Sequence, residues 1–432
     1  MSTFPSEPLP PGIDAPAKRD SRHDQFRAWV AWGAASVFLI YQLCIQNSFG
    51  SLQDQIKGDL GFDSQTLSFI SSIFFITYAG MQVPAGILID RLGAGWVIPP
   101  AILCVGIGSA LLSISDSELA ATCARLLMGA GGAFSFLGVT AITNRRISSK
   151  KIGIATGLTD GAFSAGAIFG AIGVTTLMTI SDMNWRGILM TLAVCSVPIA
   201  IINWCALGRG GAVAPRAQYQ SSSIFRDFVS VLCNTRILKI GVIYGGFTGV
   251  IFGLSGFWNI PLQEAFDRTP QEASMLTTTM FGAMIIGAPI IGSIADRVQR
   301  YLPFIGAGCI LAVIAIYPSM FISTPSPFWV VSVQFIVIGI AMSTGILVFP
   351  LACRDIERAN AGMASAIVNC MGLMAAGIFQ FAPGIIIERT QESGLIALQE
   401  GLVIFLIWPI ISLCLVLELG WKQHQAHKKL NA

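Results

Sequence analysis

Charge is scarce in this sequence, since Asp, Glu, Lys and Arg make up only 11% of its 432 residues and hydrophobic residues make up 54%. A soluble domain carries charge at roughly 25% of its positions. The breaks between the apolar runs that follow one another from Ala28 to Gly420 are too short for a soluble module. The composition therefore excludes a soluble enzyme and an appended signalling domain, and it predicts a chain that lies mostly in membrane lipid.

Histidine is also scarce: His23, His424 and His427 all lie in polar end segments. A metal or catalytic centre built from histidines inside the apolar spans is excluded, and an intramembrane enzyme lacks its usual groups. A surface metal site at His424 and His427 is less favoured than a solvated tail. The ten cysteines are irregularly spaced, without the pattern of a disulfide framework or zinc site. We expect no metal and no cofactor other than a proton gradient.

The first 27 residues lack the apolar core of a cleaved signal peptide and are rich in proline and charge, so we expect a disordered tail. Apolar runs predict twelve spans in an all-α membrane protein. They lie near 28–50, 66–88, 96–114, 117–141, 152–176, 186–206, 237–262, 272–295, 301–322, 326–351, 359–386 and 397–420. This gives a tail at 1–27, six-helix bundles at 28–206 and 237–420, a central loop at 207–236 and a tail at 421–432.

The basic residues predict the orientation of these spans. Outer loops hold only Lys57, Arg186, Arg268 and Arg389, while most of the 26 Lys and Arg residues fall in the tails, the central loop and the inner loops. Cytoplasmic loops carry such an excess, so both termini and the central loop should face the cytoplasm. The net charge of +3 forms no basic stripe, which argues against nucleic acid as a partner.

An internal repeat lies at the inner ends of the second and eighth spans. Gly86 is followed by Asp90, Arg91 and Gly93, and Gly292 is followed at the same spacing by Asp296 and Arg297. Glycine permits close helix packing, and an aspartate at a helix end can pair with an arginine or with backbone amides. We expect these residues to latch the two halves together on the cytoplasmic side. The alternative is two solvated turns.

The first copy of this repeat resembles the signature of the major facilitator superfamily, in which Gly, Asp, Arg or Lys, and a second Gly join helices 2 and 3. Basic residues that complete the signature are replaced by Ala94-Gly95-Trp96, and Gln299 stands where the second copy would have glycine. The fourth-span pattern from Arg125 to Gly132 also matches. The resemblance implies two pseudo-symmetric six-helix bundles that rock around a central site. The segment from Tyr78 to Gly86 resembles bacterial amino-acid permeases and lysosomal dipeptide carriers.

Two charged residues stand alone inside the predicted spans, Arg125 in the fourth and Asp160 in the fifth. A charge near the bilayer centre costs at least about 2.5 kcal/mol, so each is a candidate functional residue. We hypothesise that they form a buried pair in at least one conformational state, and that protonation of Asp160 breaks it. The resemblance supports a proton-related role for Arg125. The alternative is a permanent structural pair.

Polar uncharged residues in the first and seventh spans are the candidates for contact with solute, because the resemblance implies that these helices line the cavity. One helical turn separates Gln42 from Gln46, which places both on one face. Hydrogen bonding between helices is the alternative role for each of them. The full set is Tyr41, Gln42, Gln46, Asn47, Tyr244, Thr248, Trp258, Asn259 and Asn369, and the weaker candidates are Gln82, Ser343, Thr344 and Gln380.

These features predict a secondary transporter, not an enzyme, that moves a small polar organic solute by alternating access. Proton-coupled uptake of an amino acid or short peptide is favoured. The alternatives are a facilitative uniporter of dipeptides, carboxylates or nucleosides, efflux of a drug or metabolite, and a receptor without transport. We expect a monomer in contact with membrane lipid. Outer loops without Asn-x-Ser/Thr acceptors favour a bacterial inner membrane over a eukaryotic organelle.

Overall fold

The computed structural model describes residues 22–148, 151–208, 233–354, 361–390 and 394–430, together with residues 231 and 392. Within these ranges the chain is helical and has no strand. Twelve of its helices are long and apolar enough to cross a membrane, which confirms the predicted fold class. Residues 1–21 of the predicted first tail and 209–230 of the predicted central loop lie outside the described residues.

The first half contains six spans, of which the fourth and fifth are each built from more than one helical segment. They are α1 (Arg22–Leu60), α2 (Ser64–Leu92), α3 (Ala94–Ser113), α4 with α5 (Glu118–Gly132 and Phe134–Arg146), α6 with η2 and α7 (Ile152–Ile168, Phe169–Gly173 and Val174–Ser181), and α8 (Trp185–Leu207).

The second half repeats this count. Its spans are α10 with η3 and α11 (Thr235–Gly253, Leu254–Trp258 and Asn259–Glu264), α12 (Pro270–Val298), α13 (Leu302–Phe321), α14 with η4 and α15 (Phe328–Ser343, Thr344–Leu347 and Val348–Cys353), α16 (Ala361–Arg389), and α17 with α18 (Leu395–Leu402 and Ile404–Leu430). Helix α18 continues through most of the segment that the sequence assigned to a tail.

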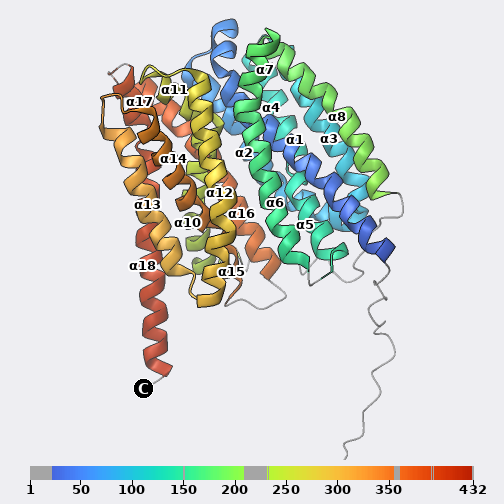
Figure 1. The fold of residues 1–432 in the computed structure, drawn as a ribbon, viewed down its shortest axis with the longest axis vertical. Helices are drawn as coiled ribbons and strands as arrows, with labels where there is room; N and C mark the ends of the chain where they lie inside the picture. The colour runs from blue at the N-terminus through green and yellow to red at the C-terminus, as the bar shows by residue number, and fades with distance from the viewer. Residues whose placement is uncertain are drawn as a thin grey trace, which may run out of the picture.

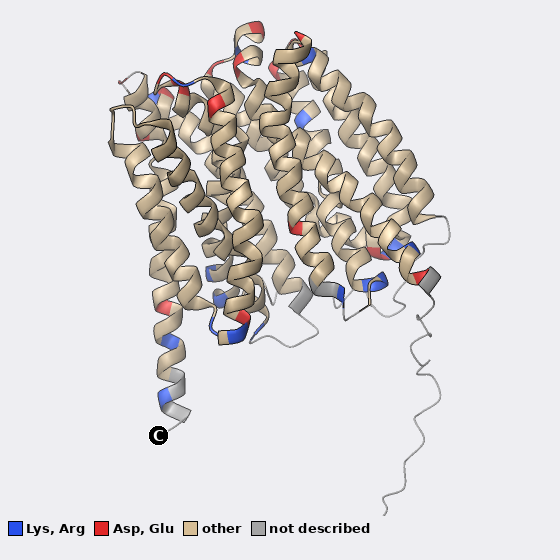
Figure 2. Ribbon diagram, viewed as in Figure 1, with Lys and Arg blue, Asp and Glu red and all other residues tan. Residues whose placement is uncertain are grey.

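The two halves form two bundles that stand side by side, with α2, α6, α12 and α16 between them (Figure 1). Helix α1 begins and α18 ends on the same side of the molecule, which we call the terminal side; the opposite side is the distal side. Lys, Arg, Asp and Glu gather at these two ends, and the belt between them is almost free of charge (Figure 2). This distribution matches a bilayer with its hydrocarbon core across the belt.

Side-chain caps show why several spans begin where they do. Asp63 accepts a hydrogen bond from the Thr66 amide at the start of α2, and Thr269 with Glu272 forms a reciprocal capping box at the start of α12. Each cap gives a partner to a backbone N–H that the first helical turn leaves unpaired. The sequence thus marks helix starts with polar residues at the distal ends of these spans.

Glycines set the close packing inside each bundle, and their pattern repeats between the halves. A Cβ atom added at Gly108 in α3 would lie 2.9 Å from the Ala124 carbonyl oxygen of α4. A Cβ atom added at Gly308 in α13 would lie 3.0 Å from the Ala341 carbonyl oxygen of α14. Side chains are excluded from both positions, because the helix backbones nearly touch there. The two bundles are therefore similar in their internal contacts as well as in their helix count.

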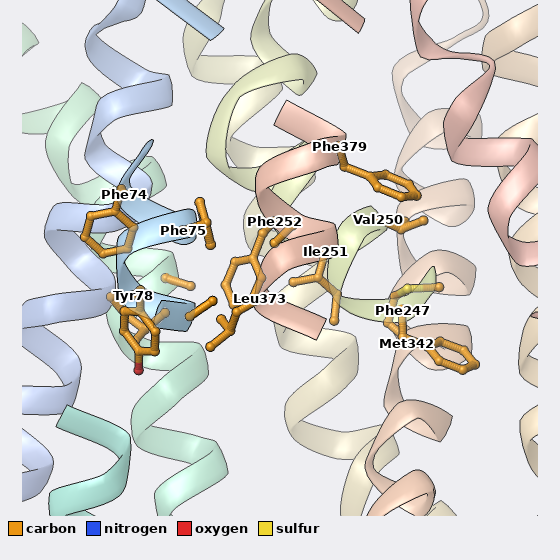
Figure 3. Close-up of a cluster of buried hydrophobic side chains, with 14 of the residues drawn as sticks. Phe74, Phe75, Tyr78, Phe247, Val250, Ile251, Phe252, Met342, Leu373 and Phe379 are labelled. Carbon is orange, nitrogen blue, oxygen red and sulfur yellow. The ribbon is translucent and has the colours of Figure 1, made fainter. Parts of the chain in front are cut away.

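Aromatic side chains fill the contact between the bundles. Phe75 of α2 and Phe252 of α10 have ring centroids 5.1 Å apart, and Figure 3 shows this pair beside Ile251 and Leu373. Phe163 of α6 also packs against Phe252, with 5.9 Å between the ring centroids. Dispersion contacts of this kind hold the halves together without fixed charge, and such an interface can slide or rock.

Candidate functional site

A cavity of about 420 Å³ lies between the two bundles. Both halves contribute to its wall, including residues of α1, α6, α10 and α16. This volume falls in the range of sites that hold small organic ligands, roughly 300–1,000 Å³. The polar residues of the wall are Gln42, Gln46, Tyr78, Thr156, Asp160, Ser164, Tyr244, Thr248, Ser343 and Asn369.

Five of the candidates for solute contact lie on this wall. Gln42 and Gln46 share the inner face of α1, and the Gln42 Nε2 donates to the Gln46 Oε1 over 2.8 Å. Tyr244 and Thr248 lie one turn apart on α10, and Asn369 lies on α16. In each helix a spacing of four residues keeps two polar side chains on the same side.

The other four candidates lie away from the wall, which corrects the prediction. The Tyr41 hydroxyl donates to the Leu192 carbonyl oxygen of α8, 2.8 Å away. Asn47 donates to the Leu43 carbonyl oxygen within α1. Tyr41 and Asn47 are each adjacent in sequence to a glutamine that faces the cavity. Successive residues of an α-helix point about 100° apart around its axis, so both side chains point away from the cavity.

Trp258 and Asn259 lie beyond the cavity, towards the distal side. The Trp258 indole N–H donates to the Gln380 carbonyl oxygen over 3.0 Å, and the Asn259 amide donates to the Ala273 carbonyl oxygen over 2.6 Å. Asn259 also donates to the Thr277 hydroxyl, 2.8 Å away. These side chains join helices, as the alternative role for the polar residues anticipated.

Arg125 is fully buried within the first bundle and is not part of the cavity wall. Its guanidinium lies 4.6 Å from the ring centroid of Phe49 and 4.7 Å from that of Phe74. Its Nη2 atom donates to the Ser71 carbonyl oxygen over 3.1 Å, and its Nε atom donates to the Ile70 carbonyl oxygen over 3.4 Å. Two aromatic faces and two carbonyls thus take the place of a carboxylate partner.

Asp160 lies on the cavity wall, and its pairing with Arg125 is not formed in this conformation. Within the described part of the chain, no side chain forms an ion pair with the Asp160 carboxylate. Tyr244 and Tyr78 are the tyrosines among the described residues of the same wall. In this conformation Asp160 is an acid that faces the cavity, and its pairing with Arg125 in another conformational state stays a prediction.

The distal side of the cavity is closed by contacts between α1 and η3. A Cβ atom added at Gly50 would lie 2.6 Å from the Gly256 carbonyl oxygen, so the two backbones touch. The rings of Phe49 and Phe257 stack with 6.4 Å between centroids, and the Gln53 amide donates to the Phe257 carbonyl oxygen over 3.1 Å. Glycine on both helices is what permits this approach.

Gln380 of α16 adds a second tie between the bundles near this closure. Its side-chain oxygen accepts from the Ser71 hydroxyl of α2, and its amide donates to the Phe252 carbonyl oxygen over 2.9 Å. Between described residues, the hydrogen bonds that join the bundles lie at cavity level or towards the distal side. Among the described residues, the contacts that close the cavity lie on the distal side.

The repeated Gly-Asp-Arg segments do not latch the halves together here, which corrects the predicted contact. Asp90 forms an ion pair with Arg145 of α5, in the same bundle. Asp296 accepts a hydrogen bond from the Tyr301 hydroxyl within the second bundle, over 3.2 Å. Burial raises the pKa of Tyr301, and the contact with Asp296 raises it further, so the phenol remains a donor.

The remaining residues of these segments form turns and exposed surface. Gly86 and Gly292 have no neighbour within 4 Å of an added Cβ atom, and Arg91 and Arg297 are exposed. Gly93 ends α2 with φ of 85°, and Gln299 ends α12 with φ of 56°. Both positions have positive φ, but ψ is 148° at Gly93 and 28° at Gln299, so the second copy ends in a left-handed residue and does not repeat the glycine turn of the first.

Sequence reasoning missed the aromatic part of the wall, which includes Tyr78, Phe136, Phe163, Phe247, Phe252 and Phe349. A signal for some of it was available. Phe163 and Ser164 follow Asp160 by three and four residues, which places all three on one face of α6. Apolar residues in a membrane span carry no mark that separates a cavity face from a lipid face.

Comparisons with known proteins agree with this architecture. The chain is 23% identical to the nitrite extrusion protein of Bacillus subtilis over 92% of its own length and 96% of that protein. It is 24% identical to the inner membrane transport protein YajR of Escherichia coli over 73% and 68% of the two chains.

Solved structures with the same fold include a mutant of the nucleoside transporter NupG, with a TM-score of 0.74, 15% identity and coverage of 90% of this chain and 99% of that one. A bacterial homologue of the human lysosomal transporter Spinster, in an inward-facing and unoccupied conformation, has a TM-score of 0.72 and 15% identity over 92% and 97% of the two chains. The profile of the Major Facilitator Superfamily matches residues 33–381. The chain belongs to the Major Facilitator Superfamily and is a multi-pass membrane transporter, not an enzyme.

Proposed function

We propose that this transporter moves a small polar organic solute through the cavity by alternating access, with Asp160 as the site of proton coupling. The observation that carries the proposal is a cavity between two bundles, closed on one side, with one unpaired carboxylate on its wall. Rocking of the bundles would break the contacts between α1 and η3 and form new contacts on the terminal side. The solute would then be exposed to each side of the membrane in turn.

The conformation described here corresponds to the inward-facing state if both termini are cytoplasmic, as the distribution of basic residues predicts. The closure lies on the distal side, which is then the outer side. The likeness to the inward-facing Spinster homologue supports this assignment. A bacterial inner membrane is the location we propose, with the protein acting as a monomer.

Proton coupling follows from the position of Asp160. An unpaired carboxylate beside a cavity must either remain hydrated, bind a proton or bind a positive group of the solute. A change in water access as the bundles rock would change the proton affinity of this group. Arg125 is held by its own bundle, so we assign it to the structure of that bundle and not to proton transfer.

The solute is the least constrained part of the proposal. Amino acids and short peptides remain the favoured class from the sequence, with nucleosides, carboxylates and exported metabolites as alternatives. The names of similar proteins include nitrite and nucleoside transport. On the part of the wall that the structure describes there is no Lys or Arg to balance an inorganic anion, so nitrite is disfavoured as the solute.

Uptake into proteoliposomes with and without a pH gradient tests this proposal. Wild-type protein should move solute faster with the gradient than without it, and Asp160→Asn should abolish that difference. Asp182→Asn is the matched control, because Asp182 is an exposed residue at the end of α7. Gradient-driven uptake by Asp160→Asn at the wild-type rate would refute the coupling role. A gradient without effect on wild-type protein would favour the facilitative uniporter.

A further inference from the structure

The cavity wall carries one member of the predicted charge pair and not the other. An arginine and an aspartate were expected to share the site, but only Asp160 faces the cavity, and Arg125 is enclosed between Phe49 and Phe74. Among the described residues that form the wall, Asp160 is the one Asp, Glu, Lys or Arg residue. The carboxylate of a zwitterionic or anionic solute would meet no Lys or Arg among the described residues of this wall.

We infer that the transported solute is a monovalent organic cation with a hydrogen-bond acceptor, whose ammonium group pairs with Asp160. This inference rests on the proposed transport function. A single negative group in a low-dielectric cavity attracts one positive charge, and one charge of each sign leaves the loaded site neutral. A neutral loaded site can cross the membrane interior during rocking without the cost of an uncompensated charge.

Aromatic rings from both bundles line the same cavity as the carboxylate and suit such a solute. Phe163 lies one turn from Asp160 on α6 and packs against Phe252 of the other bundle. Tyr244 is close enough to Asp160 for an electrostatic interaction. The centroid of its ring lies 5.0 Å from that of Phe349. The faces of such rings attract alkylammonium groups and favour them over neutral groups of the same shape.

A buried amide supplies the second half of the recognition. Gln46 is 3% exposed and lies on the wall, and its Nε2 atom has no partner within the described residues. Its oxygen already accepts from Gln42, so the free group is a donor. A buried donor without a partner costs about 1–3 kcal/mol, and a hydroxyl or carbonyl oxygen on the solute would satisfy it.

Binding of two charged probes and their neutral isosteres tests the inference. The pairs are choline with 3,3-dimethylbutan-1-ol, and acetylcholine with 3,3-dimethylbutyl acetate. Each pair has one shape and differs in charge, and both cations carry an oxygen acceptor. Titration calorimetry on the purified transporter should show at least one cation binding, and its neutral isostere binding about 30-fold more weakly or worse. Uridine, alanine and nitrite complete the panel.

Variants separate recognition from folding. Asp160→Asn should remove the preference for the cation, Asp160→Glu should retain it, and Asp182→Asn should behave as wild type. Gln46→Leu should weaken binding of the cation about tenfold through loss of the amide donor. Thermal unfolding of each variant without solute checks that the protein is folded. Three outcomes would each overturn the inference. The cations and their isosteres could bind with equal affinity, the preference for the cation could survive in Asp160→Asn, or neither cation could bind.

Uptake of the same panel keeps the two proposals apart. If proteoliposomes take up uridine, alanine or nitrite but neither cation, the transport function stands and the inference of a cationic solute fails. If none of the panel crosses the membrane with the folded protein, the inference of a cationic solute fails; the transport proposal is contradicted when dipeptides and carboxylates added to the panel do not cross either.

Discussion

The distal closure predicts a steric switch at Gly50. In Gly50→Ala the added methyl carbon would lie 2.6 Å from the Gly256 carbonyl oxygen and 2.8 Å from its carbonyl carbon. Both atoms belong to the backbone of η3 in the other bundle, so a rotamer change cannot relieve the clash. The clash exists only while the distal side is closed, and the substitution therefore destabilises that state selectively.

The size of the effect follows from the cost of overpacking, which is about 1–3 kcal/mol. A difference of that size between two conformations shifts their ratio by roughly 5- to 150-fold. The population should move from the state closed on the distal side to the state open there. Transport should slow as well, because one of the two states that the cycle requires becomes scarce.

Hydrogen–deuterium exchange of the purified protein measures this shift. Backbone amides of α1 and η3 should exchange faster in Gly50→Ala, because opening exposes them to water. Gly58→Ala is the matched control on the same helix, since its Cβ atom would meet nothing within 4 Å. Gly129→Ala is a second control, because its clash with Phe74 lies inside one bundle and should lower stability in both states. Wild-type exchange in a folded Gly50→Ala protein would refute the steric argument.

Four further substitutions test local structure by thermal unfolding in detergent. Arg125→Lys should lower stability by about 1–3 kcal/mol, because lysine cannot replace the planar guanidinium between two rings, while the affinity for solute should not change. Gly93→Ala should cost about 1–3 kcal/mol, because its φ of 85° with ψ of 148° is a conformation that glycine alone adopts readily. Gln299→Gly should be neutral or stabilising at its left-handed φ of 56° and ψ of 28°, and the reverse order of the two effects would contradict this difference between the turns. The hydrogen bond from the Thr66 amide lowers the pKa of Asp63. The Asp63 cap therefore stabilises α2 at pH values above the unfolded pKa of about 3.9, and this stabilisation is lost as pH falls through the lower folded pKa. Asp63→Ala should cost about 1 kcal/mol of stability at neutral pH and less in acid.

The spans were predictable because apolar runs of the required length are a direct consequence of bilayer thickness. The repeat was predictable because the Gly-Asp-Arg spacing recurs. The four-residue spacing of Gln42 and Gln46 predicts that they share one face of the helix. The sequence does not predict which helices or which cavity that face contacts. Helix α1 packs on α5, α6, α8 and η3, so most of its faces are covered and polar residues occur on several of them.

Arg125 shows the limit of reasoning from charge alone. Its position inside a span made it a candidate for the cavity, and the cost of burying a charge is real. The compensation comes from Phe49 on α1 and from Phe74 and two carbonyls on α2, which are distant from it in the chain. Nothing in the sequence of the fourth span indicates that partner set, so the sequence alone could not place this side chain inside its own bundle.

The two bundles share their scaffold but not their chemistry. The glycine contacts at Gly108 and Gly308 repeat, whereas the wall has Asp160 on α6 and a neutral Asn369 on α16. A symmetric scaffold lets either end of the cavity close with similar backbone contacts. An asymmetric wall fixes the charged end of a solute to the first bundle and leaves the second to contact its uncharged end. The solute can then remain bound to one half while the other moves, so release depends on water or a proton reaching Asp160 and not on the rocking motion alone.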